Sequence, residues 1–346
     1  MADWLSTLAS AVPWPLPVRP SLENLSDPDV RQVLAVTFSE LGLAVLLLTI
    51  AFVARRGLIV AILVAMTVVF LQGPNLGLLF VDATPASYRA SPTGFTDASI
   101  AAGRRVFAAN CVPCHGKAGD GVGGLGEAAN LLLPHIWTHP VGDLYWFVSH
   151  GIPAHDDVPA MPAWEAALSE PARWSAIDYI YALNAGAVTR GLDGWPHRVA
   201  APEIALSCAS LPARSIADLR GKAIRIILGA LPESLSALPP VNGIEVVTVW
   251  MPGNASSLGE ALPREVDCVA PNGPVAAEAY AILAGAADGH LVPARFLIDP
   301  EGVLRSVWRK DDGGEWADPA RLLEEARTIC TQPLTIESGG EHEHHH

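Results

Sequence analysis

Two cysteines and a histidine lie within a stretch of five residues, Cys111-Val112-Pro113-Cys114-His115. Thiols at this spacing can bond to the two vinyl groups of a haem, and the adjacent imidazole can bind its iron. The sequence therefore predicts one covalently bound haem c, attached through Cys111 and Cys114, with His115 as an axial iron ligand. A zinc half-site or a redox dithiol would need a second ligand pair or a thioredoxin scaffold, and neither surrounds residue 111.

A second axial ligand must come from another part of the chain. Met161 lies in the loop Val158-Pro159-Ala160-Met161-Pro162, which its two prolines stiffen. The other methionines are the first residue, one in an apolar run and one in the carboxy-terminal third, so Met161 is the predicted ligand. A thioether ligand raises the reduction potential of the iron. Four histidines are rivals that would give a lower potential: His135, His139, His150 and His155.

The composition points to a membrane segment. Of 346 residues, 50% are hydrophobic and 17% are charged, whereas about 25% are charged in an average soluble domain. The formal net charge of -14 excludes nucleic acid as a natural partner and suits a basic redox partner.

Two apolar runs near the amino terminus predict a membrane hairpin. The first spans residues 33–53, about the 20 residues that a helix needs to cross a bilayer. The second spans residues 57–71, is interrupted at Gln72-Gly73-Pro74-Asn75 and resumes over residues 76–81. A buried core helix is the alternative for each run, but two adjacent runs favour the hairpin.

The charges of the hairpin predict its orientation. Arg55 and Arg56 form the turn, and basic turns tend to remain cytoplasmic. Both ends of the hairpin then face the periplasm of a bacterial inner membrane, where cytochromes c mature. Glu40, inside the first run, either makes a polar contact within a bundle or lies near the outer surface in water.

Regular elements are expected along the rest of the chain. Thr96 is suited to cap a helix over 97–110 that leads into the haem motif. Two more helices are expected, at 141–149 and 170–183. From residue 203 apolar strands alternate with helices, a pattern typical of an α/β domain. Strands are predicted at 224–228, 244–250, 294–298 and 303–308, and helices at 274–286 and 319–330.

Residues 97–185 resemble a small class I cytochrome c. In that family a glycine and an aromatic of the first helix pack against an aromatic of the last, which implies such a contact for Gly103, Phe107 and Tyr179. The resemblance also implies protein ligands on both haem faces, which suits electron transfer better than catalysis. It is carried by Gly103, Phe107, the Cys111 to His115 motif, His150-Gly151-Ile152-Pro153, Met161-Pro162, Trp174, Tyr179 and Leu183.

Residues 203–332 resemble a thioredoxin or peroxiredoxin domain. Pro293 and Asp299-Pro300-Glu301-Gly302 match a proline that opens a strand and a turn into the next strand. Asp218-Leu219-Arg220-Gly221-Lys222 matches a short stretch before the central strand. The chain departs from that family at residues 229–235, where no cysteine follows the central strand. The sequence therefore predicts a domain without thiol chemistry.

Three further cysteines, Cys208, Cys268 and Cys330, allow one disulfide and one free thiol, and the sequence leaves the pairing open. The tail 341–346 holds four histidines. Metal binding is one interpretation of this tail and a solvated or purification-tag segment is the favoured one.

The linker Thr84-Pro85-Ala86-Ser87-Tyr88 and the cytochrome are similar to bacterial membrane proteins of the copper-resistance D type with a fused cytochrome c. Those relatives have many more membrane spans, so no copper transport is expected here. The predicted fold is multidomain, with a two-helix membrane hairpin, an all-α class I cytochrome c and an α/β thioredoxin-like domain. The predicted divisions are 1–32 (periplasmic segment), 33–81 (membrane helices), 82–96 (linker), 97–185 (cytochrome), 186–202 (linker), 203–332 (thioredoxin-like domain) and 333–346 (tail).

The expected function is single-electron transfer by a membrane-anchored periplasmic cytochrome. Its partners would be the inner membrane and either other membrane redox subunits or soluble cytochromes. One alternative is an accessory haem subunit of a larger membrane complex. Another is an enzyme whose iron loses Met161 and reacts, or one with thiol activity.

Overall fold

A computed structural model describes residues 18–21, 28–55, 57–154, 159–190, 194–232, 235–254, 262–312 and 319–331. These residues form two compact units. The first unit joins the chain up to Ala90 with His135–Ala154 and Pro159–Ala163. The second joins Ser91–Pro134 with the chain from Trp164 onward. Arg56, His155 and the histidine-rich tail lie outside the described residues.

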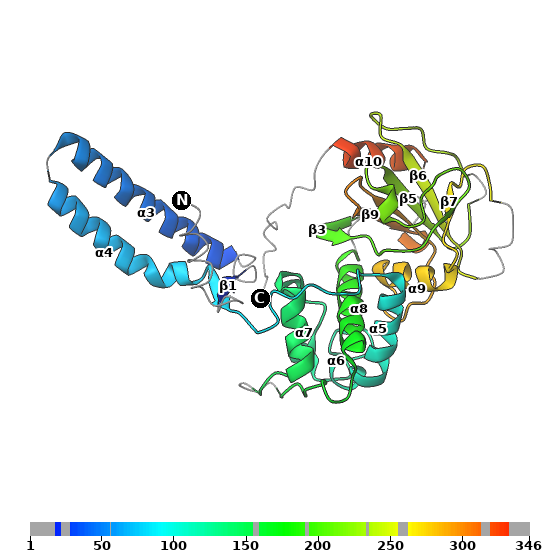
Figure 1. The fold of residues 1–346 in the computed structure, drawn as a ribbon, viewed down its shortest axis with the longest axis horizontal. Coiled ribbons are helices and arrows are strands. Elements are labelled where there is room, and N and C mark those ends of the chain that lie inside the picture. The colour runs from blue at the N-terminus through cyan, green and yellow to red at the C-terminus, as the bar shows by residue number, and fades with distance from the viewer. Residues whose placement is uncertain are drawn as a thin grey trace, which may run out of the picture. The chain divides into compact units, whose positions relative to one another are not determined.

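Helices α3 (Pro28–Ala54) and α4 (Leu58–Gly77) of the first unit form an antiparallel hairpin (Figure 1). Within the described residues, one helix segment, Val30–Ala54, is long and apolar enough to cross a membrane, and the apolar part of α4, Leu58–Gln72, is shorter. Large apolar side chains on both helices are exposed, including Phe52 and Phe70. An exposed apolar surface of this extent suits contact with lipid.

The apolar part of α4 ends at Gln72, where the sequence run is interrupted, but the helix itself continues through this polar segment to Gly77. The polar side chains of the segment bond to α3 and to one another. Asn75 Nδ2 donates to Thr37 Oγ1 at 3.2 Å, and Thr37 Oγ1 donates to Gln72 Oε1 at 3.0 Å. Gln72 Nε2 also donates to Glu40. Since their partners are on the neighbouring helix, these side chains do not end α4 by competing for its backbone.

Short strands tie together the chain segments that enter and leave the hairpin. β1 (Val18–Pro20) pairs antiparallel with β2 (Phe80–Asp82). The backbone N–H of Ser21 extends this pairing by donating to Leu79 O at 2.8 Å. Helix α7 (Val141–His150), which belongs to the same unit, begins where it was predicted and ends one residue later.

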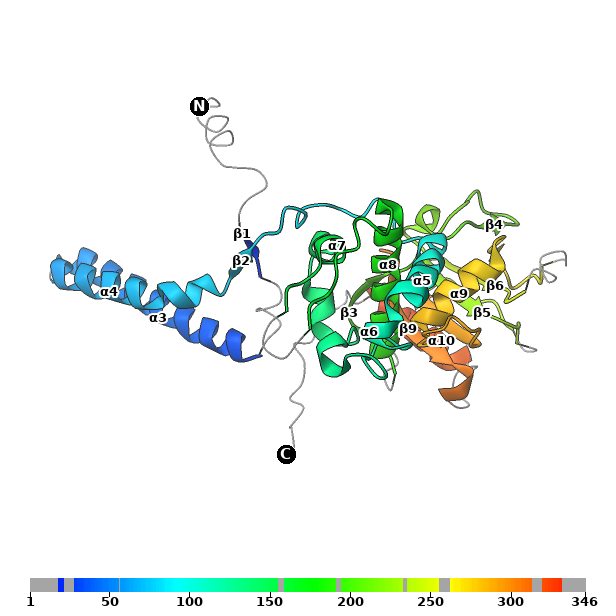
Figure 2. The same ribbon diagram turned by 90° about the horizontal axis from the view of Figure 1, so that it is seen from below.

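The second unit contains α5 (Asp97–Asn110), the one-turn α6 (Val112–His115) and α8 (Glu170–Val188). Thr96 caps α5 as predicted, since its Oγ1 accepts from the backbone N–H of Ser99 at 3.1 Å. Ser169 caps α8 in the same way, at 3.4 Å from the N–H of Ala172. The two helices lie side by side (Figure 2).

A seven-stranded sheet follows in the same unit, with the order β3-β9-β8-β5-β6-β7-β4. The central strand β5 pairs parallel with β6 and antiparallel with β8, and β8 pairs antiparallel with β9. None of the described residues between β5 and β6 is helical. The strands are β3 (Gly194–Ala200), β4 (Ser207–Cys208), β5 (Ala223–Leu228), β6 (Val246–Met251), β7 (Cys268–Val269), β8 (Ala294–Ile298) and β9 (Val303–Arg309).

Two helices, α9 (Gly273–Leu283) and α10 (Pro319–Thr331), cover opposite faces of this sheet (Figure 1). On the α10 face, Leu322 and Leu297 belong to one buried apolar cluster. On the α9 face, the rings of Tyr280 and Phe296 meet edge to face at 5.2 Å. Burial on both faces explains the continuous apolar runs that predicted β5 and β8.

Helix α9 also packs on helices α5 and α8 (Figure 2). Arg104 Nε on α5 lies 2.6 Å from Glu278 Oε1 on α9. The hydroxyl of Tyr179 on α8 donates to Ala287 O, just beyond α9, at 2.8 Å. Because α9 contacts both the sheet and α5 and α8, these parts form one compact body.

The chain enters and leaves the cytochrome helices at one place. Thr96 and Glu203 form a parallel bridge. Glu203 N donates to Phe95 O at 3.0 Å, and Asp97 N donates to Glu203 O at 3.1 Å. We refer to these contacts of residues 95–97 with residue 203 as the clamp.

The cysteines outside the haem motif pair as one disulfide. Cys208 and Cys268 are directly opposite each other on β4 and β7 and are bonded, and Cys330 is a free thiol. The structure thus answers the pairing that the sequence left open. The bond closes a sequence separation of 60 residues at the edge of the sheet.

Candidate haem-binding site

A close contact between α5 and α8 supports the candidate site. Gly103 is buried, and a β-carbon placed on it would lie 1.8 Å from Ser175 O and 2.8 Å from Tyr179 Cβ. Only a residue without a side chain permits this approach. One turn further on, the rings of Phe107 and Tyr179 lie 5.1 Å apart. The contact that the resemblance implied for these residues is present.

The Cys111 to His115 motif follows α5 without a break. The backbone N–H of Cys111 donates to Phe107 O at 2.8 Å, so the motif begins as the cap of α5. The N–H groups of Cys114 and His115 both donate to Cys111 O, at 3.2 and 2.9 Å. The single turn of α6 therefore presents the two thiols and the imidazole from one short segment.

A glycine-containing loop closes behind this turn. A β-carbon on Gly124 would lie 2.1 Å from Cys114 O, and the N–H of Leu125 donates to the same carbonyl at 2.8 Å. Gly116 ends α6 with a φ of 73°, in the region that favours glycine. These contacts hold the backbone of Cys114 in place.

The orientation of His115 is fixed by a backbone carbonyl. Its Nδ1 lies 2.7 Å from Ala129 O, and since a carbonyl only accepts, Nδ1 carries the proton. Nε2 therefore keeps the lone pair that an iron ligand needs. The ring lies 6.3 Å from that of Phe107, which places it beside the contact between α5 and α8. The sequence could not point to Ala129, because the group that contacts His115 is its backbone oxygen, which every residue has.

The thiols suit attachment of haem. Cys111 and Cys114 are free and half-buried. Burial raises the pKa of the Cys111 thiol to about 11, and the nearby Cys114 adds to the rise. The Cys111 thiol is therefore protonated at neutral pH, and the two cysteines are not paired with each other. Two free thiols and an imidazole with its lone pair available are the donor set that haem c requires.

A further polar residue shapes the loop that leads from this motif. Asn184 on α8 is fully buried, and its Nδ2 donates to Leu131 O at 2.7 Å and to Leu133 O at 3.0 Å. The segment after Ala129 is thus held to α8. Nothing in the sequence distinguished Asn184 from other polar residues of the helix.

Met161 lies in the first unit, in a short antiparallel bridge with Ile152. The two residues exchange both backbone hydrogen bonds, at 3.1 and 2.9 Å. Gly151 permits this contact, since a β-carbon there would lie 2.4 Å from Met161 O. The loop thus has a defined backbone as expected, and the role of Met161 as an iron ligand stays a prediction.

Two of the rival histidines lie among described side chains. The His150 ring stacks on Trp146 at 3.6 Å, and its Nδ1 lies 3.2 Å from Trp146 O. The His139 ring meets Phe147 edge to face at 6.1 Å. The side chain of His135 and the whole of His155 lie outside the described residues. His150 is exposed at the end of α7, where it makes these contacts.

A turn with two free thiols and an oriented imidazole, on a helix packed tightly against the last helix, defines a cytochrome c domain. Such domains bind haem c and carry electrons. Residues 98–180 match the family described as cytochrome c oxidase, cbb3-type, subunit III. The match spans α5, the motif and most of α8, and it supports an electron carrier rather than a catalytic enzyme.

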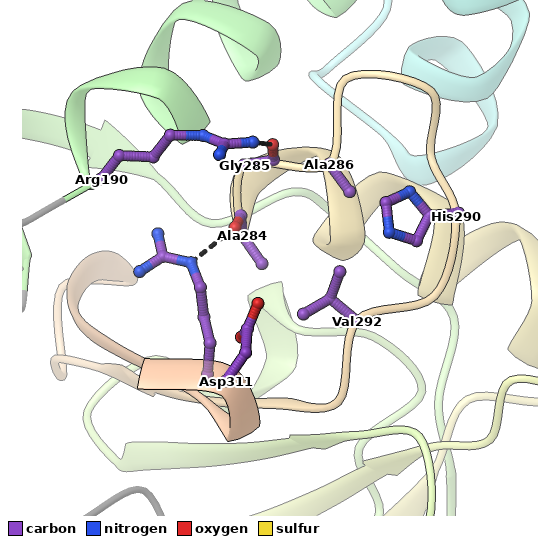
Figure 3. A pocket seen from close by; sticks show the side chains of 8 residues that line it. Arg190, Ala284, Gly285, Ala286, His290, Val292 and Asp311 are labelled. Carbon is purple, nitrogen blue, oxygen red and sulfur yellow. Dashed lines mark hydrogen bonds between the residues drawn. The ribbon is translucent and has the colours of Figure 1, made fainter. Parts of the chain in front are cut away.

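A cavity of about 360 Å³ lies elsewhere in the second unit (Figure 3). It is lined by Arg190, Arg309 and residues just after α9. Arg190 Nη2 donates to Gly285 O, and Arg309 Nε donates to Ala284 O at 2.6 Å. The arginines thus satisfy carbonyls at the carboxyl end of α9, where a positive charge is favoured.

No cysteine stands directly after β5, at residues 229–235. Gly229 follows β5 directly, with a φ of 88°, and its carbonyl accepts a hydrogen bond from Trp250 Nε1 at 2.8 Å. Pro293 lies opposite, 3.6 Å from a β-carbon placed on Gly229. Among the described residues, the groups around Gly229 are therefore the side chain of Leu291, the ring of Pro293 and the indole of Trp250.

Proposed function

We propose that the protein is a membrane-anchored cytochrome c that passes single electrons between a respiratory or dehydrogenase donor and a downstream acceptor on the periplasmic side of a bacterial inner membrane. One haem c would be covalently held by Cys111 and Cys114, with His115 and Met161 on its iron. The enzymatic alternatives are not favoured, because two protein ligands leave the iron no position for a substrate.

The observation that carries this proposal is the hydrogen bond between His115 Nδ1 and Ala129 O, 2.7 Å long. With Nδ1 bonded, Nε2 is the ring nitrogen left to bind iron. The imidazole belongs to the same turn that presents two free thiols. The bound haem supplies the one-electron couple. The chain's own residues orient the imidazole and supply a hydrogen-bond acceptor for its Nδ1.

Absorption spectroscopy of the full chain in detergent tests the ligands. The oxidised protein should show the weak long-wavelength band of a thioether-ligated iron, and Met161→Ala should lose that band and bind carbon monoxide rapidly when reduced. Met66→Leu, at an exposed position of α4, is the matched control and should keep the band. A wild-type protein without the band and with rapid carbon monoxide binding would exclude Met161.

The hairpin and its charges support the membrane placement. α3 has the length and composition of a membrane span, and Arg55 lies in the turn that follows it. In a chain whose free thiol is removed by Cys330→Ser, an Arg55→Cys variant should react with a membrane-impermeant reagent only after the cytoplasmic face is opened. Reaction in intact cells would reverse the proposed orientation.

A second candidate function is that of a haem subunit in a larger membrane redox complex. It is favoured by the family that residues 98–180 match, whose description names an oxidase subunit. Purification from the native membrane in mild detergent separates the two candidates. A stable set of co-purifying subunits supports the complex, and a chain that elutes alone supports the independent carrier.

We further propose that the carboxy-terminal part is a thioredoxin-like domain without thiol activity. The strand order β9-β8-β5-β6, with α9 and α10 on opposite faces, supports this assignment. A Cys208→Ser, Cys268→Ser, Cys330→Ser variant should show the same rate of disulfide exchange as the wild type. Loss of an exchange activity in that variant would contradict the proposal.

A further inference from the structure

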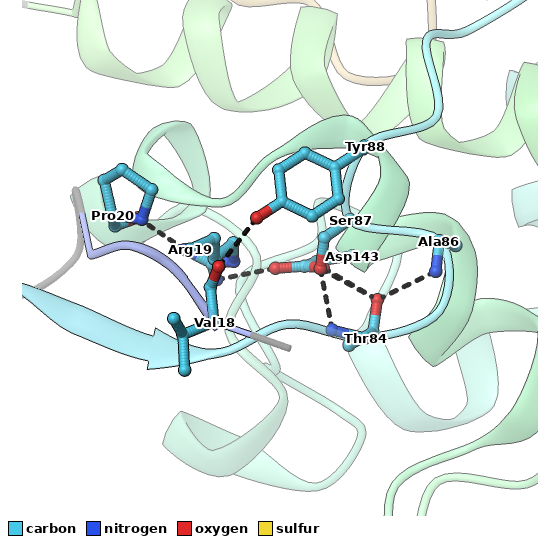
Figure 4. A network of polar contacts seen from close by, with 8 residues as sticks. All are labelled: Val18, Arg19, Pro20, Thr84, Ala86, Ser87, Tyr88 and Asp143. Carbon is cyan, nitrogen blue, oxygen red and sulfur yellow. Dashed lines mark hydrogen bonds and ion pairs between the residues drawn. The ribbon is translucent and has the colours of Figure 1, made fainter. Parts of the chain in front are cut away.

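The segment that leaves the hairpin lies against the first turn of α7. We refer to residues 80–89, which comprise β2 and the turn after it, as the strap (Figure 4). Its turn is closed by Ser87 N, which donates to Thr84 O at 3.1 Å, and by Arg89 N, which donates to Ala86 O at 2.8 Å. The hydroxyl of Tyr88 donates to Val18 O on β1 at 2.7 Å. The strap therefore has a defined shape and is held to β1.

One carboxylate of α7 receives donors from both the strap and β1. Asp143 is 1% exposed, and its Oδ2 lies 2.6 Å from Arg19 Nη2. Its Oδ1 accepts from Thr84 Oγ1 at 2.8 Å and from Ser87 Oγ. Figure 4 shows the side chains of Arg19, Thr84 and Ser87 meeting at Asp143. A carboxylate buried this deeply is stable only with such partners.

Steric and aromatic contacts surround this polar cluster. A β-carbon on Gly142 would lie 1.8 Å from Ala86 O, so the strap backbone lies directly on α7. The guanidinium of Arg89 lies 4.7 Å from the centre of the Tyr145 ring, which is buried. The amino-terminal half of α7 is thus fixed to the strap at Gly142, Asp143 and Tyr145.

The other end of α7 leads to Met161. The helix ends at His150, and Gly151 follows with a φ of 77°. The next residue, Ile152, exchanges two backbone hydrogen bonds with Met161. A displacement of α7 along or about its axis would therefore carry the backbone of Met161 with it.

We propose that Asp143 is a positioning residue for the distal iron ligand. It fixes α7 to the strap and β1, and α7 in turn fixes the loop that presents Met161. The part of the chain that emerges from the hairpin would then set the ligand's position. This inference rests on the proposed role of Met161.

The test compares variants of the haem-loaded full chain in detergent. Asp143→Asn removes the charge that pairs with Arg19, and the pair Thr84→Val and Ser87→Ala removes only the hydroxyl donors. Asp82→Asn is the matched control, since Asp82 is an exposed carboxylate on β2. The readouts are the long-wavelength band, the rate of carbon monoxide binding to the reduced form and the helical circular dichroism.

We expect Asp143→Asn to lose most of the band and to bind carbon monoxide faster, with its helical signal kept. The two hydroxyl substitutions should weaken the band under conditions in which the wild type and Asp82→Asn keep it, because they remove two donors from Asp143 Oδ1. The inference is overturned if the wild type has the band and both sets of variants keep it unchanged. If Asp143→Asn does not fold, the hydroxyl variants decide the matter. A wild type without the band refutes the role of Met161 and the inference with it.

Discussion

Replacing Gly103 with alanine should destabilise the haem domain. The added β-carbon would lie 1.8 Å from Ser175 O, while an unstrained contact needs about 3.4 Å, so α5 and α8 would have to separate by roughly 1.5 Å. Overpacking of this kind costs about 1–3 kcal/mol or more. Alanine gains about 1 kcal/mol over glycine in helix propensity. Since the obstacle is a helix backbone, we expect a net loss of about 2 kcal/mol.

The loss should appear as a lower melting midpoint in the haem absorbance. Because α8 also packs on α9, the cooperative unit includes the sheet, and about 2 kcal/mol corresponds to roughly 4–8 °C for a unit of this size. Gly42→Ala on α3 is the control, as no atom lies within 4 Å of a β-carbon there. It should leave the haem melt unchanged. A Gly103→Ala midpoint at or above the wild-type value would refute the proposed close contact.

Three further outcomes are expected. Burial lowers the pKa of His197 to about 4, so the unfolded chain takes up a proton below its ordinary value of about 6.5 and the folded chain does not. The free energy of unfolding measured in urea should therefore decrease as the pH is lowered from about 6.5 to about 4. His197→Gln should make this decrease with pH less steep. Cys208→Ser with Cys268→Ser should cost about 2–5 kcal/mol in guanidinium unfolding; an unchanged midpoint would contradict a structural bond. Tyr179→Phe should cost about 1 kcal/mol in guanidinium unfolding by leaving Ala287 O without its donor.

Local signals in the sequence were sufficient for the cytochrome helices. The cap at Thr96 and the run to Asn110 predicted α5 at its observed bounds, because capping and periodicity depend on neighbouring residues. The same holds for β5 and β8, whose apolar runs are buried on both faces. The haem motif needed only spacing, and the family match of residues 98–180 agrees with it.

Features set by distant residues were not predicted. Residues 194–200, placed in a linker, form β3 by pairing with β9, and no local pattern reports a partner a hundred residues away. The continuation of α4 past Gln72 depends on Thr37 and Glu40 of α3. Within the site, the carbonyl of Ala129 and the carboxylate of Asp143 act through contacts that only the folded chain creates.

The clamp determines how mechanical force passes through the molecule. Residues 95–97 are bonded to Glu203 before the haem helices begin and after they end. A pull applied between Ser91 and the carboxy-terminal sheet would therefore load these few hydrogen bonds first. The haem helices form a closed loop beside that path and carry tension only after the clamp opens. A single-molecule pulling record should accordingly show a small early extension before the haem domain unfolds.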